Sequence, residues 1–440
     1  MKTSKSIKAM VLLTGLTFLY GCGDRLQPIE IGPKGYGHTT LANGVTVLVN
    51  HDESTSLTGA RILIAGGVLT EIAENNGISN LMTKMLLKGN DVMTASEITE
   101  RLDFLGASVS VTCFRDYSAI SFASLTENFD EVMEIISRSV VAPTFPEDEL
   151  SKLKQEIEGN IKASDDNQSQ ASNKLFWKTA YGNQGYGLPT LGTVESISNI
   201  TVEQIRKHYD AYVGGRNIIF SVATDLPAER IATLVNSRLG AIKAEARQVA
   251  APPLTLQPEK TGFISFERNQ SFVYTGVILD RLEAAEIAYV ALLNEIMGNN
   301  VGSRLWYLRQ KEKLAYAIYT IYDISRYCNA FRAAIGTDTT KVKTALASLD
   351  REWNRLVADG ITADELADAK INLKNNLIPQ VESKSSRATY MAYYEYLGLG
   401  QRFVLDLIAT VDDISVEQVN RFVGERFTDD RRYTSIVGKK

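Results

Sequence analysis

The feature that most constrains this sequence is a weak internal repeat. Residues 145–150, F-P-E-D-E-L, recur as I-T-A-D-E-L at 361–366, an offset of 216. Residues 200–205, I-T-V-E-Q-I, recur as I-S-V-E-Q-V at 414–419, an offset of 214. Two matches in the same order and at nearly the same offset indicate a duplicated chain. Its 440 residues are enough for two substantial hydrophobic cores.

Both repeated segments predict helix starts. They contain the capping-box spacing, in which a Ser or Thr side chain and a Gln or Glu three residues later satisfy free N–H groups of the first turn. The pairs are Thr201 with Gln204, Ser415 with Gln418 and Thr362 with Glu365.

Strands and helices are expected in matching blocks in the two halves. The predicted strands are 45–49, 60–65, 107–113, 118–123, 274–279, 315–322 and 330–335. The predicted helices are 78–87, 95–105, 129–140, 147–163, 284–297 and 340–358. Residues 107–113 and 118–123 should form a hairpin that turns at Arg115 and Asp116. This order predicts an α+β protein of two homologous domains, each a mostly antiparallel sheet with helices packed on one face.

The domain boundary is expected near the Pro-containing stretch at residues 250–253. We predict an N-terminal domain at 39–245, a linker at 246–260 and a C-terminal domain at 261–440. Two similar halves joined in this way could close on each other like a clam, with a ligand cleft between them.

The first residues predict export and a lipid anchor. Lys2, Lys5 and Lys8 precede an apolar stretch at residues 9–21, which is too short to span a bilayer that needs ~20 residues. The sequence L-Y-G-C at 19–22 is similar to a bacterial lipobox, which implies a signal peptide at 1–21 and lipidation of Cys22. The alternative is an ordinary signal peptide with an incidental cysteine.

A chain lipidated at Cys22 would hang from a membrane by its acyl chains and face the periplasm. Asp24 stands one place beyond the position that would favour inner-membrane retention, so the outer membrane is the expected location. Residues 22–38 are Gly- and Pro-rich without periodicity and are interpreted as a tether, with structure beginning near Thr39.

Charge and cysteine usage exclude some functions. The net charge of −5 comes from interspersed acids and bases, with no basic block, so a nucleic-acid partner is not expected. Cys113 and Cys328 fall in strand-like segments of opposite halves. They could form a disulfide or, as we expect, stay as two buried free thiols.

The three histidines do not form a metal-binding pattern. None of them has a second histidine three or four residues away, and the sequence contains no C-x-x-C. We place His38 in the tether, His51 in a turn and His208 on an exposed helix, as isolated surface histidines.

Residues 77–89, G-I-S-N-L-M-T-K-M-L-L-K-G, resemble a conserved helix of the insulinase/pitrilysin zinc peptidases, typically G-L-A-H-L-L-E-H-M-L-F-K-G. In that family two histidines bind zinc and the glutamate acts on metal-bound water. Here the corresponding residues are Asn80, Thr83 and Lys84. The resemblance places the family's last ligand, a glutamate, near Asn160, and Glu158 would point elsewhere on that helix. The chain is therefore expected to bind no metal itself.

Residues 302–316, G-S-R-L-W-Y-L-R-Q-K-E-K-L-A-Y, resemble the family's second-half signature. In active members its Arg and Tyr face the zinc and help to hold the peptide, and the matching residues are Arg309 and Tyr316. A guanidinium and a phenol are suitable donors to a peptide carbonyl. The alternative is that this segment only packs a helix onto a strand, with Arg309 in a surface salt bridge.

The resemblance covers residues 39–438 and implies a member that is not catalytic on its own. Some of these peptidases have two subunits, one of which lacks the metal site. The first hypothesis is therefore an accessory subunit that binds peptide beside a zinc-motif paralogue, with zinc only in that partner. The alternative is a scaffold or peptide-binding envelope protein with no proteolytic role, as for the family's core proteins in respiratory complexes.

Overall fold

The computed structural model describes residues 29–250 and 255–439, so the predicted signal peptide and the lipidation of Cys22 lie outside the described residues. The first sheet has the order β1-β2-β6-β3-β5-β4. Its strands are β1 Tyr36–Thr40, β2 Thr46–His51, β3 Leu57–Ala65, β4 Ser108–Cys113, β5 Tyr117–Leu125 and β6 Ile218–Thr224. Only the β2–β6 pair is parallel.

The second sheet has the order β7-β11-β8-β10-β9. Its strands are β7 Thr261–Ser265, β8 Gln270–Leu279, β9 Ala317–Asp323, β10 Asn329–Asp338 and β11 Arg432–Gly438. The β7–β11 pair is parallel and the others are antiparallel. The two sheets share one topology, with β1 added to the first, which confirms the predicted α+β fold of two homologous domains.

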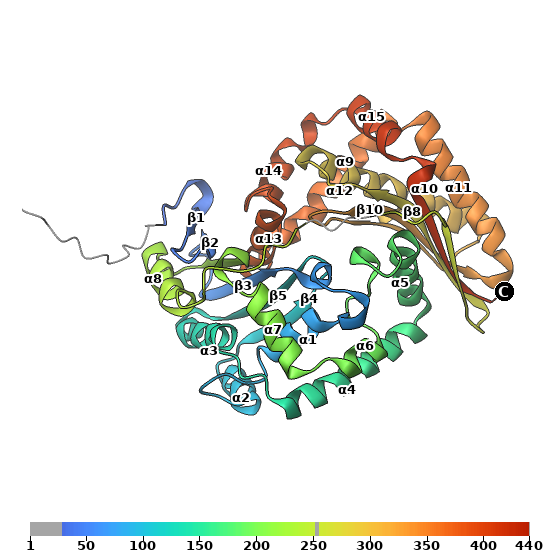
Figure 1. The fold of residues 1–440 in the computed structure, drawn as a ribbon. Coiled ribbons are helices and arrows are strands. Elements are labelled where there is room, and N and C mark those ends of the chain that lie inside the picture. The colour runs from blue at the N-terminus through green and yellow to red at the C-terminus, as the bar shows by residue number, and fades with distance from the viewer. Residues whose placement is uncertain (1–28, 251–254, 440) are drawn as a thin grey trace, which may run out of the picture.

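The helices follow matching orders in the two halves (Figure 1). Those of the first half are α1 Ile78–Met85, α2 Ala95–Phe104, α3 Phe129–Val141, α4 Glu147–Asp166, α5 Gln168–Tyr181, α6 Val194–Asn199, α7 Val202–Tyr212 and α8 Ala228–Leu239. Those of the second half are α9 Ala284–Asn294, α10 Arg304–Tyr307, α11 Val342–Asp359, α12 Ala363–Glu382, α13 Lys384–Leu397, α14 Phe403–Thr410 and α15 Val416–Arg426. Residues Leu308–Glu312 continue α10 as a π-helical turn.

Each sheet has one face against helices of its own half. In the first half, α1, α3 and α8 cover a core that includes Ile62, Ile64 and Phe122. These residues alternate along β3 and β5 with residues that point to the opposite face, as the two-residue period of a strand requires. Burial of this apolar face is the main force that holds the half together.

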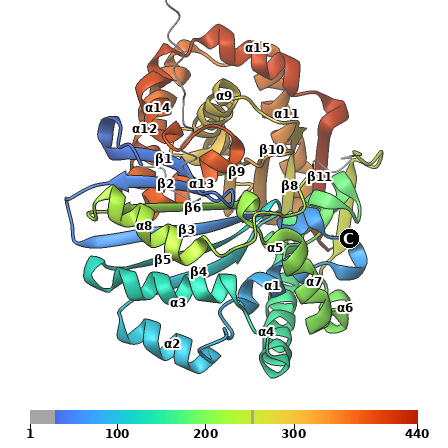
Figure 2. The same cartoon turned by 60° about the vertical axis from the view of Figure 1, so that its left-hand side comes forward.

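The other face of each sheet is covered by a helix from the opposite half. Helix α13 lies across β3 and β6, and α5 lies across β8 and β11 (Figures 1 and 2). Ser221 Oγ donates to the Ala388 carbonyl at 2.5 Å, and Ser435 Oγ donates to the Ser172 carbonyl at 2.7 Å. The four residues match at the offsets of the sequence repeat, so the two contacts are related by the duplication. The halves therefore pack directly against each other.

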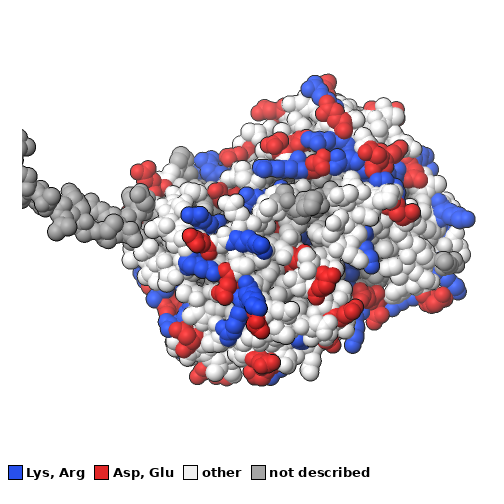
Figure 3. All heavy atoms as spheres, in the orientation of Figure 1, with Lys and Arg blue, Asp and Glu red and all other residues white. Residues whose placement is uncertain are grey.

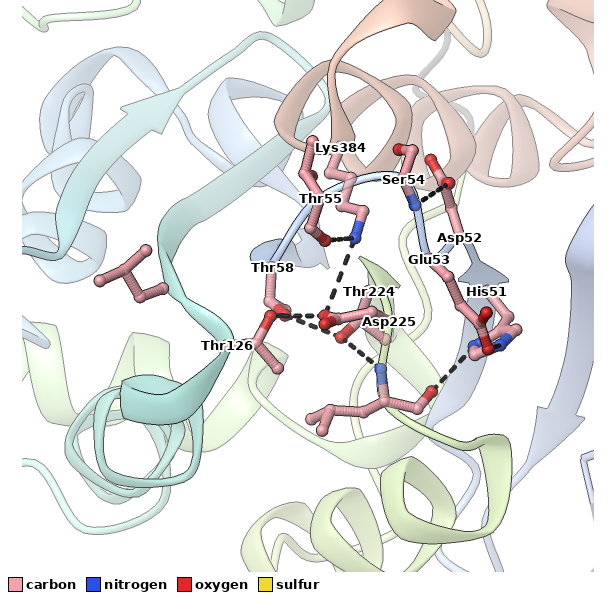
Figure 4. Close-up of polar contacts among 12 residues, drawn as sticks. His51, Asp52, Glu53, Ser54, Thr55, Thr58, Thr126, Thr224, Asp225 and Lys384 are labelled. Carbon is pink, nitrogen blue, oxygen red and sulfur yellow. Dashed lines mark hydrogen bonds and ion pairs between the residues drawn. The ribbon is translucent and has the colours of Figure 1, made fainter.

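Polar contacts fasten the start of α13 to the first half (Figure 4). Lys384 is 5% exposed, and its Nζ donates to the Thr55 carbonyl at 2.6 Å and lies 3.8 Å from Asp225 Oδ1. Asp225 also accepts a hydrogen bond from Thr126, and Thr58 Oγ1 lies 3.0 Å from Thr126 Oγ1. A buried ammonium with a carboxylate and a carbonyl as partners is satisfied in place.

The tether prediction was wrong at its C-terminal end. Residues 36–38 belong to β1, which pairs with β2, and Ile29 is 5% exposed within the core. Pairing with the next strand of the chain fixes this segment, and its own composition carries no sign of that. Residues 246–250 and 255–260 contain no helix or strand.

Both cysteines with described positions are free thiols, as expected, although Cys113 is only partly buried whereas Cys328 is buried. Within residues 29–250 and 255–439, no helix is both long and apolar enough to cross a membrane. Acidic and basic side chains are interspersed on the face of the molecule shown in Figure 3.

Candidate functional site

Helix α1, which matches the family's zinc-binding helix, begins at a specialised N-terminus. Gly77 precedes it with φ of 97°, a conformation that favours glycine. The buried Glu71 carboxylate accepts from the backbone N–H groups of Gly77 and Ser79, each at 2.8 Å, and from Asn76 Nδ2 at 2.7 Å. These bonds satisfy N–H groups that a helix start leaves free. Burial raises the pKa of Glu71, and the three donors oppose that shift.

Two of the three residues at the zinc-motif positions face the protein interior. Asn80 is 3% exposed and Thr83 is fully buried. Thr83 Oγ1 donates to the Ser79 carbonyl at 2.7 Å, so its hydroxyl is engaged by its own helix. Asn80 Nδ2 has no acceptor among the described residues. An amide and a hydroxyl offer neither an anionic nor an imidazole ligand for zinc.

The third position forms a salt bridge in place of a metal bond. Lys84 Nζ lies 3.2 Å from Glu156 Oε1 on α4. An ammonium repels a cation, so these residues do not fit a zinc ion. Asn160, the expected position of the last ligand, is exposed one helical turn beyond Glu156. Glu156 is thus the residue of α4 that forms a salt bridge with Lys84 of α1. Because it lies four residues before Asn160, on the same face of the helix, the sequence could have indicated it.

An open hollow lies beside this degenerate site. It measures about 400 Å³ and is bounded by α1, α2, β4 and α4. Its lining includes the charged residues Lys84 and Glu156 and the apolar side chains of Leu102, Val109 and Val111. Strand β4 is the edge of its sheet and, among the strands that the structure describes, pairs only with β5, so its outer edge is open to a further strand.

The histidines are arranged differently from the prediction. His208 is buried, with Nε2 3.0 Å from Ser79 Oγ, and burial lowers its pKa to about 4. The prediction of an exposed His208 was wrong because the residue lies on the same face of α7 as the buried Ile205. His38 and His51 lie in strands β1 and β2, so neither is in the tether or turn that we predicted. In the described parts of the chain, no group of three or more His, Cys, Asp or Glu residues is placed to hold a metal.

The second-half signature is anchored by a buried ion pair. Arg304 is 8% exposed, and its Nε and Nη2 donate to the two carboxylate oxygens of Glu365 at 2.7 and 2.8 Å. Arg304 Nη2 also donates to the Gly360 carbonyl at 2.8 Å. Such two-pronged pairing fixes the position of α10 strongly. The arginine that holds this segment against the rest of the second half is therefore Arg304, not Arg309.

Arg309 and Tyr316 are both exposed. The Arg309 guanidinium lies 4.9 Å from the centre of the Trp306 ring and forms no salt bridge with any residue that the structure describes. Tyr316 is 47% exposed, and its ring lies over Gly336, where any side chain would collide with it. The surface salt bridge that was the alternative for Arg309 is thus absent from the described residues.

The two signature segments do not meet within this chain. Helix α1 belongs to the first half and α10 to the second, at separate places in Figure 1. Neither Arg309 nor Tyr316 lines the hollow beside Lys84. The residues that resemble a peptide clamp are therefore not part of the hollow at this chain's own degenerate metal site.

Comparison with known proteins gives matches over both halves. The family model "Insulinase (Peptidase family M16)" matches residues 46–194, and "Peptidase M16 inactive domain" matches residues 199–373. The "Uncharacterized zinc protease YmxG" of Bacillus subtilis is 25% identical over 393 residues, which cover 89% of this chain and 95% of that protein. The "Non-peptidase homolog YmxG" of Helicobacter pylori is 22% identical over 361 residues, which cover 81% and 83%.

A solved structure has the same fold. The crystal structure described as the peptidase M16 inactive domain from Pseudomonas fluorescens superposes with a TM-score of 0.85 at 20% identity, covering 92% of this chain and 98% of that one. Two family models in sequence order, together with this fold, account for both homologous halves. The chain therefore belongs to the insulinase family, peptidase family M16, as a non-catalytic member without the His-x-x-Glu-His zinc motif.

Proposed function

We propose that this chain is the non-catalytic subunit of a heteromeric zinc peptidase and helps to bind the peptide substrate. A paralogue with an intact motif would hold the zinc. The observation that carries this proposal is the state of Arg309 and Tyr316, which are exposed and belong to the other half of the chain from α1. In this chain they have no metal site to serve, whereas a partner's site could receive them.

The hollow beside β4 supports a role in peptide binding. An extended peptide can add a strand to a free sheet edge through main-chain hydrogen bonds. Val109 and Val111 of β4 line the hollow, so alternate side chains of such a peptide would meet an apolar wall. Lys84 and Glu156 would offer one charge of each sign at the same place.

We also propose that the mature chain is lipid-anchored through Cys22 and faces the periplasm, with the outer membrane as its location. The lipobox-like sequence at 19–22 supports this proposal. An anchored accessory subunit would hold its catalytic partner near the membrane. Mass analysis of the purified native protein tests this proposal, since it should show a diacylglyceryl-modified N-terminal cysteine.

The proposed assembly is tested by purifying the tagged full chain from its own cells in mild detergent. The eluate is assayed on unfolded peptides with and without a chelator, and its zinc content is measured. We expect a stoichiometric zinc-motif paralogue and cleavage that the chelator abolishes. A chain that associates only with itself, or with unrelated envelope proteins and without cleavage, would contradict the proposal and favour the scaffold alternative.

A further inference from the structure

Arg61 occupies an unusual place for a charged residue. It lies in β3 in the middle of the first sheet, is only 5% exposed, and points to the face covered by α13. Its neighbours across the sheet are Ser121 on β5 and Ser221 on β6. Its guanidinium carbon lies 5.9 Å from the centre of the Phe114 ring and 5.6 Å from that of Tyr117.

Arg61 differs from the other buried cations by having no counter-charge. Four lysine or arginine residues are buried in the described part of the chain. Three of them form ion pairs: Arg304 with Glu365, Arg332 with Asp323 and Lys384 with Asp225. Among the described residues Arg61 forms no ion pair, and its Nε has no hydrogen-bond partner. Apart from burial, the groups that act on its charge are the phenols of Tyr117, Tyr390 and Tyr393, and that of Tyr117 also acts through a hydrogen bond.

A buried charge without a counter-charge is costly, since burial removes its hydration. The aromatic rings offset only part of this cost, because a cation–π contact stabilises by roughly 0.5–2 kcal/mol. Where such a buried cation borders a cavity, an anion that binds in the cavity can supply the missing counter-charge.

Arg61 lines a cavity of about 390 Å³ between the first sheet and α13. It is the only charged residue of that lining, which also holds eight hydroxyl side chains: Ser108, Ser110, Thr112, Ser121, Ser385, Ser386, Thr389 and Tyr390. Ser108, Ser110 and Thr112 are exposed on the edge strand β4, so the cavity opens to solvent along that strand. A second cavity of about 370 Å³ adjoins it and shares Arg61, Phe114, Thr389 and Tyr390. The charged residues Arg115, Asp116 and Asp323 line this second cavity, not the first.

We propose that this cavity binds a small organic carboxylate whose charged end pairs with the Arg61 guanidinium. The planar fork of a guanidinium matches both oxygens of a carboxylate, and the hydroxyl groups around it supply further donors. A single cation with no lysine or second arginine in the lining suits one negative charge better than the two of a phosphate. The volume lies within the range of small-molecule sites, and Phe114 and Tyr390 offer an apolar wall to the rest of the ligand.

The proposal is tested by calorimetric titration of the full chain with N-acetylphenylalanine, its neutral amide and inorganic phosphate. N-acetylphenylalanine should bind at least tenfold more tightly than the amide, and phosphate should bind no more tightly than the amide. Equal binding of acid and amide, no binding of the acid, or tighter binding of phosphate would each overturn the proposal.

Variants of the chain assign the binding to Arg61. Arg61→Met should lose at least tenfold in affinity for N-acetylphenylalanine without a lower unfolding temperature, because it removes an unpaired buried charge. Ser121→Asp places a carboxylate directly across the strands from Arg61. It should raise the unfolding temperature above that of the matched Ser121→Asn variant and abolish binding, whereas Ser121→Asn, which adds no charge, should still bind N-acetylphenylalanine.

The Ser121 pair keeps the test decisive if Arg61→Met does not fold. Unchanged affinity in Arg61→Met, or equal affinity and equal unfolding temperature in the two Ser121 variants, would remove Arg61 from the site. None of these results depends on a zinc-bearing partner, so they are independent of the proposed peptidase assembly.

Discussion

Lys84 and Glu156 join α1 to α4 through a salt bridge of 3.2 Å at a position where the family's active members have a zinc ligand. The contact replaces metal coordination with a pair of opposite charges. Its two side chains are 26% and 56% exposed, so water screens much of the attraction.

This salt bridge should therefore contribute little to stability. A double-mutant cycle of Lys84→Ala and Glu156→Ala, followed by urea unfolding, should give a coupling energy of about 0.2–1 kcal/mol. The exposed pair of Lys207 and Glu203 on α7 serves as the control, with a coupling in the same range. A coupling of several kcal/mol between Lys84 and Glu156 would show that the bridge holds α1 in place.

Glu71 should matter much more for the same helix. The Glu71 carboxylate now accepts hydrogen bonds from two backbone N–H groups. In Glu71→Gln the NH₂ group of the amide, itself a donor, would replace one of the two accepting oxygens. We expect a loss of roughly 1–3 kcal/mol in the free energy of unfolding. Glu74→Gln, at an exposed position nearby, should change it by less than about 0.5 kcal/mol. Similar values for the two variants in urea unfolding would contradict this account of the helix start.

His208 should make the fold sensitive to mild acid. Its pKa is about 4 in the folded chain and about 6.5 in the unfolded chain, so the unfolded state binds the proton more tightly. The stability contribution is complete above about pH 6.5 and is lost as the pH falls toward 4, by about 3 kcal/mol in total at most.

Comparison of the natural chain with His208→Gln isolates this effect from other titrating groups. Between pH 6.5 and 4, the free energy of unfolding of the variant should fall less steeply. Parallel curves for the natural chain and His208→Gln would show that the imidazole is not buried uncharged.

Arg309→Ala should leave folding and assembly intact but lower the activity of the proposed complex. The loss could approach ~3 kcal/mol of transition-state stabilisation, or about a hundredfold in rate, as for one oxyanion donor. Lys311→Ala, which removes another exposed cation of the same turn, is the matched control and should retain activity. Peptide cleavage by the assembled complex is the measurement, and an unaltered rate in Arg309→Ala would exclude it from the shared site.

Local signals in the sequence were sufficient for many elements. The three capping boxes form as predicted, with the side chains of Thr201, Thr362 and Ser415 accepting from the backbone at their predicted partners. The hairpin of β4 and β5 also forms, because its alternation and its turn lie within one short segment. These features depend on residues close together in the chain.

What the sequence did not reveal depends on contacts between distant segments. Helices α5 and α13 lie between the two halves and touch protein on more than one side, so they lack the single apolar stripe of a surface helix. The missing counter-charge of Arg61 becomes evident only when β3, β5 and α13 are placed together. In contrast, the burial of His208 could have been predicted from its spacing of three from Ile205.

The reciprocal contacts of Ser221 with Ala388 and of Ser435 with Ser172 have a consequence for the history of the fold. A single half would leave one face of its sheet bare and would carry a helix with no sheet to cover. Two identical copies could satisfy both needs at once by exchanging that helix around a two-fold axis. The ancestor before duplication is thus expected to have been a helix-swapped homodimer, which gene fusion made into one chain.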